Sequence, residues 1–197
     1  LVRDIQIHPV TNDLILGTHG RGVMIVDDIT SMRKLNKETI DKEVHLFEMK
    51  PMNLTMGNFG NSGFPPTGGW VAPNPPSITP IQYYLKDRVS SGKVEVEIYD
   101  AAGKLVQTLP GSSRKGINKV TWNQRITPPK TASGSTKRDF GAFIAPQVLP
   151  GEYTAKLKVG GKEYVQPLKL LDDPSDNYTI ADKELQFKTS MDLYNMH

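Results

Sequence analysis

Short segments in which apolar and polar residues alternate recur along this chain, separated by turn-forming residues. The clearest lies at residues 93–99, where Val94, Val96 and Ile98 fall on one face of an extended backbone. Strict alternation is typical of a half-buried β-strand and does not fit an amphipathic helix, whose apolar residues recur every three to four positions. The chain is therefore predicted to fold mostly as β-structure.

Residues 81–172 form the most regular unit. Asp100-Ala-Ala-Gly103 predicts a turn that closes one hairpin, and Gly160-Gly161 predicts a tighter second hairpin. Strands are expected at residues 81–85, 93–99, 104–109, 116–122, 152–159 and 162–171. About seven short strands in about 90 residues are the pattern of an immunoglobulin-like or fibronectin-III-like β-sandwich. Its expected core includes Ile117, Val120, Trp122, Tyr153, Ala155, Leu157 and Val159.

The first 50 residues carry further strand signals at residues 1–7, 14–16, 23–26 and 44–47. The first three, joined by tight turns, amount to most of one blade of a β-propeller. A lone blade cannot bury both of its faces. We therefore expect these strands to pack against neighbouring blades or, through their unpaired edges, to add a strand to the sandwich or pair with a second copy of the chain.

Two helical segments are predicted. The first is a turn over residues 31–35, capped by Asp28 or Thr30. The second begins near Thr179-Ile-Ala-Asp182, which resembles a capping box with Asp in place of the usual Glu. Three larger side chains then follow at helical spacing, namely Phe187, Met191 and Tyr194.

Residues 51–80 are rich in glycine, proline and asparagine, which oppose regular structure, so we expect an ordered covering loop or a linker. The aromatic residues in or beside this stretch are Phe59, Phe64, Trp70, Tyr83 and Tyr84. Exposed rings of this kind would stack on sugars. The alternative, which we favour, is that they pack on the sandwich, because aromatic side chains usually bury large areas.

These patterns divide the chain into four segments. They are residues 1–50, the terminal propeller-blade strands and connector; 51–80, the covering loop or linker; 81–172, the sandwich; and 173–197, a C-terminal helical segment. The chain opens at Leu1 within a strand-like pattern and ends at His197 within a helical one. We therefore expect it to be the C-terminal piece of a larger protein.

Composition excludes several classes of site. The chain has 0 cysteines, which excludes disulfides, thiolate nucleophiles and cysteine zinc sites. The net charge of +3 comes from scattered basic residues, unlike the clustered basic face of a nucleic-acid-binding protein. No apolar run approaches the roughly 20 residues of a membrane span. Metal-ligand spacing is missing among the histidines, which are His8, His19, His45 and His197. We expect no cofactor, nucleic acid or membrane span.

Two motifs suggest chemistry, and each has a simpler interpretation. Gly17-Thr-His-Gly-Arg-Gly22 looks like a phosphate-binding loop but lacks the Lys-Ser/Thr pair and a following helix, which favours a tight turn. Within it, His19 and Arg21 remain candidates to line a propeller mouth. Asp27-Asp28 offers two carboxylates, but sequence neighbours on a strand point to opposite faces, which favours a turn and helix cap. Asp172-Asp173 is interpreted in the same way.

Two stretches resemble a known family. Asp4-Ile-Gln-Ile-His-Pro9, Asp13-Leu-Ile-Leu-Gly-Thr-His-Gly-Arg-Gly-Val23 and Ile25-Val-Asp-Asp28 resemble the last blade of sortilin-type, BNR-repeat glycosyl hydrolase-like propeller proteins, which are common in Bacteroidetes. Ile98–Val106, Gly116–Trp122 and Leu149–Thr154 resemble the sandwich that follows there, and also the immunoglobulin-like domain of flagellar hook-capping proteins.

The resemblance implies a secreted, periplasmic or cell-surface location and an upstream propeller that would hold any glycan-active site. The chain has no Asp-box of the form Ser-x-Asp-x-Gly-x-Thr-Trp, so this piece is expected to be non-catalytic. We favour a structural and interaction module whose partner is the rest of the parent propeller. The alternatives are a carbohydrate-binding accessory domain and, least favoured, a glycoside hydrolase that uses His19, Arg21 and the Asp27-Asp28 pair. The glycan-binding residues of the second alternative would be Phe64, Trp70, Tyr83 and Tyr84.

Overall fold

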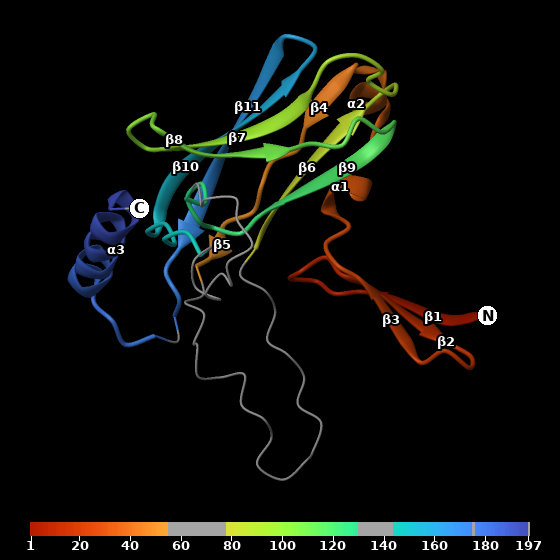
Figure 1. The fold of residues 1–197 in the computed structure, drawn as a ribbon. Helices are drawn as coiled ribbons and strands as arrows, with labels where there is room; N and C mark the ends of the chain where they lie inside the picture. Colours follow the sequence, from red (N-terminus) through yellow and green to blue (C-terminus); the bar gives the residue numbers. More distant parts are fainter. Residues whose placement is uncertain (55–77, 130–143, 175, 197) are drawn as a thin grey trace, which may run out of the picture.

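The computed structural model describes residues 1–54, 78–129, 144–174 and 176–196, and it is mostly β-structure with a C-terminal helix, as predicted (Figure 1). The strands are β1 (Val2–Ile7), β2 (Leu14–Thr18), β3 (Val23–Val26), β4 (Val44–Leu46), β5 (Met52–Asn53), β6 (Thr79–Leu85), β7 (Val94–Asp100), β8 (Leu105–Pro110), β9 (Gly116–Trp122), β10 (Gly151–Val159) and β11 (Lys162–Leu171). The helices are α1 (Thr30–Arg33), α2 (Lys37–Asp41) and α3 (Ile180–Asn195).

A two-layer sandwich occupies the centre of the fold. One sheet has the strand order β5-β11-β10-β7-β8 and the other has the order β4-β6-β9. Neighbouring strands are antiparallel except β5 and β11, which run parallel. The predicted hairpin at Gly160-Gly161 is confirmed, because both glycines adopt positive φ angles, 55° and 80°, that suit a tight two-residue turn.

The core lies between the two sheets and follows the alternation seen in the sequence. Val94, Val96 and Ile98 of β7 are buried and face Ile81 and other inward residues of β6. Residues of β10 and β11 complete the cluster, and the most deeply buried of them are Ala155, Leu157, Leu168 and Leu170. Apolar area removed from water in this way is the main stabilising term of such a domain.

Trp122 is the largest fully buried side chain of this core. Its indole Nε1–H donates a hydrogen bond to the carbonyl oxygen of Arg125 at 2.9 Å, and its ring centroid lies 5.5 Å from that of Tyr153. The prediction that Ile117 shares this core is wrong. Because Ile117 is an odd number of positions from Trp122, it lies on the outer face of β9, opposite Tyr84 of β6.

The sandwich begins earlier in the chain than residue 81. Its three-stranded sheet takes β4 from the segment that we predicted to be a connector, and its five-stranded sheet takes β5 from the predicted loop. Strands of two or three residues are too short to show a period, so their pairing could not be seen in the sequence. The short helix α2, whose N-cap Asn36 accepts a hydrogen bond from the Thr39 backbone N–H, was also missed.

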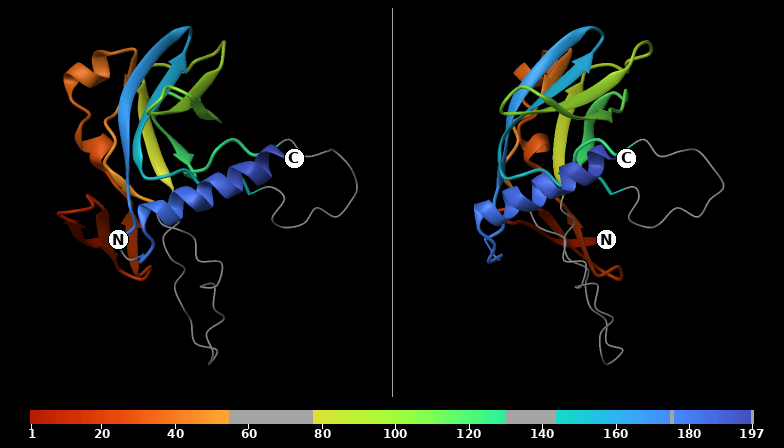
Figure 2. Two further views of the ribbon diagram at one scale, coloured as in Figure 1. Left: turned by 90° about the vertical axis from the view of Figure 1, so that its left-hand side faces the viewer. Right: turned by 60° about the vertical axis from the view of Figure 1, so that its left-hand side comes forward.

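Helix α3 lies across one end of the sandwich, the end opposite the β10–β11 turn (Figure 2). The predicted capping box is confirmed, with reciprocal hydrogen bonds between Thr179 and Asp182. Lys183, only 4% exposed, forms ion pairs with Asp172 and, at 2.8 Å, with Asp176. Hydrogen bonds to these two carboxylates raise the pKa of Lys183 above its ordinary value. Near the other end of the helix, the Tyr194 hydroxyl donates to the carbonyl oxygen of Thr127 at 3.0 Å.

The N-terminal sheet consists of β1, β2 and β3 in that order, and it projects from the sandwich as a separate three-stranded meander (Figure 1). All three strands were predicted. No residue of these three strands is buried, although most of their side chains are apolar. The sheet therefore contributes little to the core of this chain.

Candidate functional site

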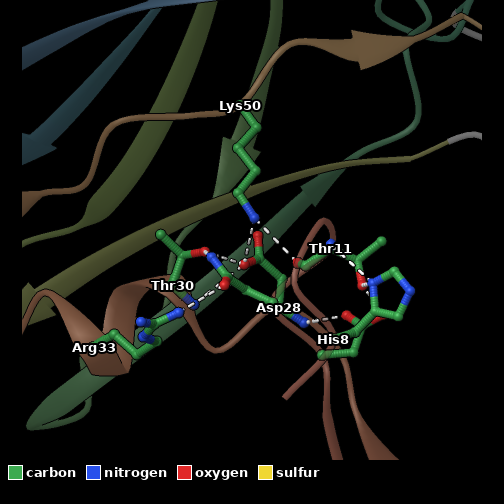
Figure 3. A network of polar contacts seen from close by, with 8 residues as sticks. His8, Thr11, Asp28, Thr30, Arg33 and Lys50 are labelled. Atoms are coloured by element: carbon green, nitrogen blue, oxygen red, sulfur yellow. Dashed lines mark hydrogen bonds and ion pairs between the residues drawn. The ribbon is translucent and has the colours of Figure 1, made fainter.

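The N-terminal sheet meets the rest of the chain through a cluster of polar side chains (Figure 3). We call this cluster the joint. It combines the turn between β1 and β2, the segment that leads into α1, and one lysine that precedes β5. Its members are His8, Thr11, Asn12, Asp13, Asp28, Thr30, Arg33 and Lys50.

Asp28 is the centre of the joint. Its Oδ1 accepts hydrogen bonds from the Thr30 backbone N–H at 3.1 Å and from the Thr30 hydroxyl, and it pairs with Lys50 Nζ at 3.1 Å. Lys50 also donates to the carbonyl oxygen of Thr11 at 3.1 Å, so one ammonium group bridges both sides of the joint. Asp28 has a φ of 43°, a left-handed conformation that Asp tolerates better than most residues.

Asn12 forms the second bridge. It also adopts a left-handed conformation, with φ of 60°. Its side-chain amide donates to the Thr30 hydroxyl at 2.9 Å, and its side-chain oxygen accepts from Arg33 Nη1 at 2.8 Å. Its backbone carbonyl accepts from the Ile29 N–H at 2.9 Å. The β1–β2 turn is thereby held against the start of α1 by three hydrogen bonds from a single residue.

Asp13, which directly precedes β2, also connects the β1–β2 turn to the segment that leads into α1. Its carboxylate accepts from the Asp28 backbone N–H at 2.8 Å and from the Thr11 hydroxyl at 2.6 Å, and these contacts lower the pKa of Asp13 below its ordinary value. For Asp28, burial alone raises the pKa, but the hydrogen bonds from Thr30 and Lys50 outweigh it and the net shift is downward. Both carboxylates are therefore held ionised as hydrogen-bond acceptors, which suits a structural role.

The joint is built for attachment rather than for acid–base chemistry. The Asp28 carboxylate is occupied by Thr30 and Lys50. The prediction that Asp28 or Thr30 caps α1 is wrong, because the N-cap is Ile29, no side chain makes the cap hydrogen bond, and Thr30 is already the first residue of the helix. Asp27 is exposed. The structure does not bring His19 and Arg21 to these carboxylates, because both lie in the β2–β3 turn at the far end of β2. An extended strand rises about 3.3 Å per residue, so His19 lies about 20 Å from Asp13.

The aromatic residues predicted to bind glycans fall into two groups. Tyr83 is fully buried and donates its hydroxyl to the carbonyl oxygen of Ser112 at 2.6 Å, and Tyr84 is 8% exposed on the other face of β6. Neither ring is accessible for stacking on a sugar, so the glycan-binding prediction is wrong for these two. Phe64 and Trp70, together with Phe59, lie outside the described residues.

Sequence reasoning found some members of the joint and missed others. Asp28 and Thr30 were singled out, although as helix caps, and a tight turn was expected between the strands at residues 1–7 and 14–16, where Asn12 and Asp13 lie. Lys50 and Arg33 carried no signal, because each acts through a contact with a residue distant in the sequence, as in the pair of Lys50 and Asp28.

Comparisons with protein-family models, with curated proteins and with solved structures gave no match. Within the described parts of the chain, no group of three or more histidine or acidic side chains is placed to hold a metal ion. Among the helices in the same ranges, none has the length and apolar character needed to cross a membrane.

Lowering the pH should open the joint. In the folded state, Asp13 and Asp28 have pKa values below the ordinary 3.8. Their contribution to stability is therefore complete above pH 3.8 and is lost as the pH falls through the pKa values of the folded state. The amides of Asp28 and Ile29, which donate to Asp13 and Asn12, should lose hydrogen-exchange protection on acidification before the amides of β10 do.

The variant Asp28→Asn should reproduce this loss of protection at neutral pH, because it removes the ion pair with Lys50 while keeping the side-chain shape. Asp27→Asn is the matched control, since Asp27 is exposed and adjacent. Equal exchange behaviour of the two variants would contradict the role assigned to Asp28.

Proposed function

We propose that this chain is a non-catalytic structural and interaction module, in which the N-terminal sheet docks on other β-sheets of a parent propeller and the joint fixes its orientation relative to the sandwich. One observation carries the proposal: the N-terminal sheet presents a continuous apolar surface that no described residue of this chain covers. A surface of this kind usually marks an interaction site.

The apolar surface consists of two cross-strand rows. Directly paired residues of neighbouring strands share a face, and residues two apart on one strand share it as well. The rows are Ile5–Leu16–Met24 and Ile7–Leu14–Val26. Ile5 is 60% exposed and Met24 is 50% exposed, whereas a blade within a propeller is sandwiched between its neighbours. We call this surface the apolar face of the N-terminal sheet.

The opposite face of the same sheet is also apolar in part. Ile15 pairs with Ile25, and Val23 at 66% exposure lies beside Gly17. A sheet with apolar residues on both faces is typical of an inner layer. This supports docking on both sides, as in a propeller, rather than a single covering partner.

The strand order of the sandwich supports the immunoglobulin-like part of the proposal. A β4-β6-β9 sheet opposite a β8-β7-β10-β11 sheet has the arrangement of the A-B-E and C′-C-F-G strands of such domains. The parallel strand β5 beside β11 takes the place of an additional strand next to G. Modules of this type are used as spacers and braces, which fits a role next to a propeller.

The proposal predicts that the isolated chain exposes an apolar surface on its N-terminal sheet. The chain should therefore bind a hydrophobic dye, and sedimentation velocity should show self-association that increases with protein concentration. Met24→Glu should remove most of both effects without changing the unfolding transition of the sandwich. Val165→Glu is the matched control, because Val165 is 56% exposed on the outer face of β11, away from the N-terminal sheet. Dye binding and association that survive Met24→Glu would overturn the proposal.

A turnover screen on glycosides tests the non-catalytic part of the proposal. The folded chain should hydrolyse none of them, and turnover by the chain that is lost in Arg21→Ala would favour the hydrolase alternative instead. A secreted or cell-surface location and the bacterial propeller relationship remain predictions from the sequence resemblance.

A further inference from the structure

The β10–β11 turn lies at the end of the sandwich away from the N-terminal sheet and α3 (Figure 1). A cavity of about 290 Å³ opens at this end, lined by Gly160 of that turn among others. It lies between the two sheets, where β6 and β10 end and β4 and β11 begin. Its floor is apolar and continuous with the core, with Leu85 and Val159 both buried. The half-buried ring of Tyr164 forms part of its wall.

The rim of this cavity carries more available positive charge than negative charge. Glu43 is neutralised by Lys162 at 2.8 Å, and Asp87 pairs with Lys115 at 3.4 Å. Among the described residues, the hydrogen bond that Lys86 donates goes to the backbone carbonyl oxygen of Asp41, at 3.3 Å.

Arg88 lines the same rim and is exposed. Among the residues that the structure describes, no carboxylate lies within ion-pair distance of its guanidinium. Lys86 and Arg88 therefore both line the cavity as cations, and neither forms an ion pair with a described carboxylate, although Lys86 is one of the charges that lower the pKa of Glu43.

We propose that this cavity binds a small organic carboxylate built on one ring. The ring would lie on Leu85 and Val159 beside Tyr164, and the carboxylate would be held at the rim by Arg88 and Lys86. Guanidinium groups bind carboxylates through two parallel hydrogen bonds, which favours a planar monoanion at this position. The volume is at the lower limit of small-molecule pockets and suits one ring rather than an oligomer.

Two classes of compound combine one ring with a carboxylate, namely sugar acids and aromatic acids. The site goes beyond the proposed docking function, because it lies at the other end of the sandwich and shares no residue with the joint or with the apolar face of the N-terminal sheet. Failure of one proposal therefore leaves the other intact.

Titration of the full chain with glucuronate and with phenylacetate, followed by NMR, tests the inference. Saturable binding of either probe should shift the signals of Arg88 and Tyr164, and the neutral counterparts glucose and phenylacetamide should bind at least about tenfold more weakly, since hydrogen bonds to charged groups contribute about 1.5–3 kcal/mol. Binding of glucuronate alone identifies a sugar acid, and binding of phenylacetate alone identifies an aromatic acid.

Arg88→Gln should weaken carboxylate binding about tenfold or more for the same reason. Because Arg88 is exposed, the Arg88→Gln variant should unfold at the same urea concentration as the parent. Arg3→Gln, on β1, is the charge-matched control and should bind as the parent does. The inference is overturned if neither probe saturates, if neutral counterparts bind equally well, or if Arg88→Gln and Arg3→Gln bind alike.

Discussion

Replacing Trp122 by alanine should lower the free energy of unfolding by about 3–5 kcal/mol. The indole is fully buried, contacts Tyr153 and donates to the Arg125 carbonyl oxygen, so its removal leaves a large cavity and a carbonyl without its donor. A loss of this size is a large part of the 5–15 kcal/mol by which a typical domain is stable. Urea unfolding followed by circular dichroism measures it directly.

Trp122→Phe separates the two contributions. It keeps an aromatic ring in the core but removes the Nε1–H, so the expected loss is clearly smaller than for alanine. An alanine variant that unfolds at the parent urea concentration would show that this residue is not part of a rigid core.

Gly111→Ala should destabilise the sandwich by about 1–3 kcal/mol, the usual cost of overpacking. A Cβ atom at Gly111 would lie 2.7 Å from Val94 Cγ1 and 3.0 Å from both the Tyr83 hydroxyl and the Val94 carbonyl oxygen. The carbonyl belongs to a central strand and cannot move easily, because it accepts the Gly111 backbone N–H at 2.8 Å.

Gly17→Ala is the matched control for that substitution. Gly17 is likewise outside the left-handed region, but a Cβ there meets Asp4 at an ordinary 3.5 Å. We expect the free energy of unfolding of the Gly17→Ala variant to differ from the parent value by less than about 0.5 kcal/mol, as for a surface substitution. Equal effects of the two alanines in urea unfolding would contradict the steric argument for Gly111.

The elements that could be predicted from the sequence are those long enough to show a repeating pattern of apolar and polar residues. The alternation at Val94, Val96 and Ile98 and the paired glycines at 160 and 161 both gave the correct structure, because side-chain direction and turn conformation are local properties. The strand β5 could not be predicted, because its pairing with β11 depends on residues more than a hundred positions away.

The candidate sites were harder to predict for the same reason. Asp28 was predicted to cap α1, which it does not do, and its pairing with Lys50 depends on how the sandwich places the chain before β5. Tyr83 and Tyr84 are adjacent and both buried, since the inner face of β6 meets the core and its outer face carries Tyr84 opposite Ile117. The cavity beside Arg88 involves strand ends from both sheets, which no single segment reveals.

The ion pairs of Lys183 have a consequence for how the whole chain loses structure. Helix α3 forms these ion pairs at one end and the Tyr194 hydrogen bond near the other. Phe187 and Met191 are half-buried, whereas Leu185 and Leu193 are exposed, and none of these apolar side chains belongs to the core cluster of the described residues. The N-terminal sheet is likewise attached through a polar cluster rather than a shared core. The chain therefore consists of one cooperative unit, the sandwich, and two peripheral units that can exchange their amides by local opening at a lower free energy than global unfolding.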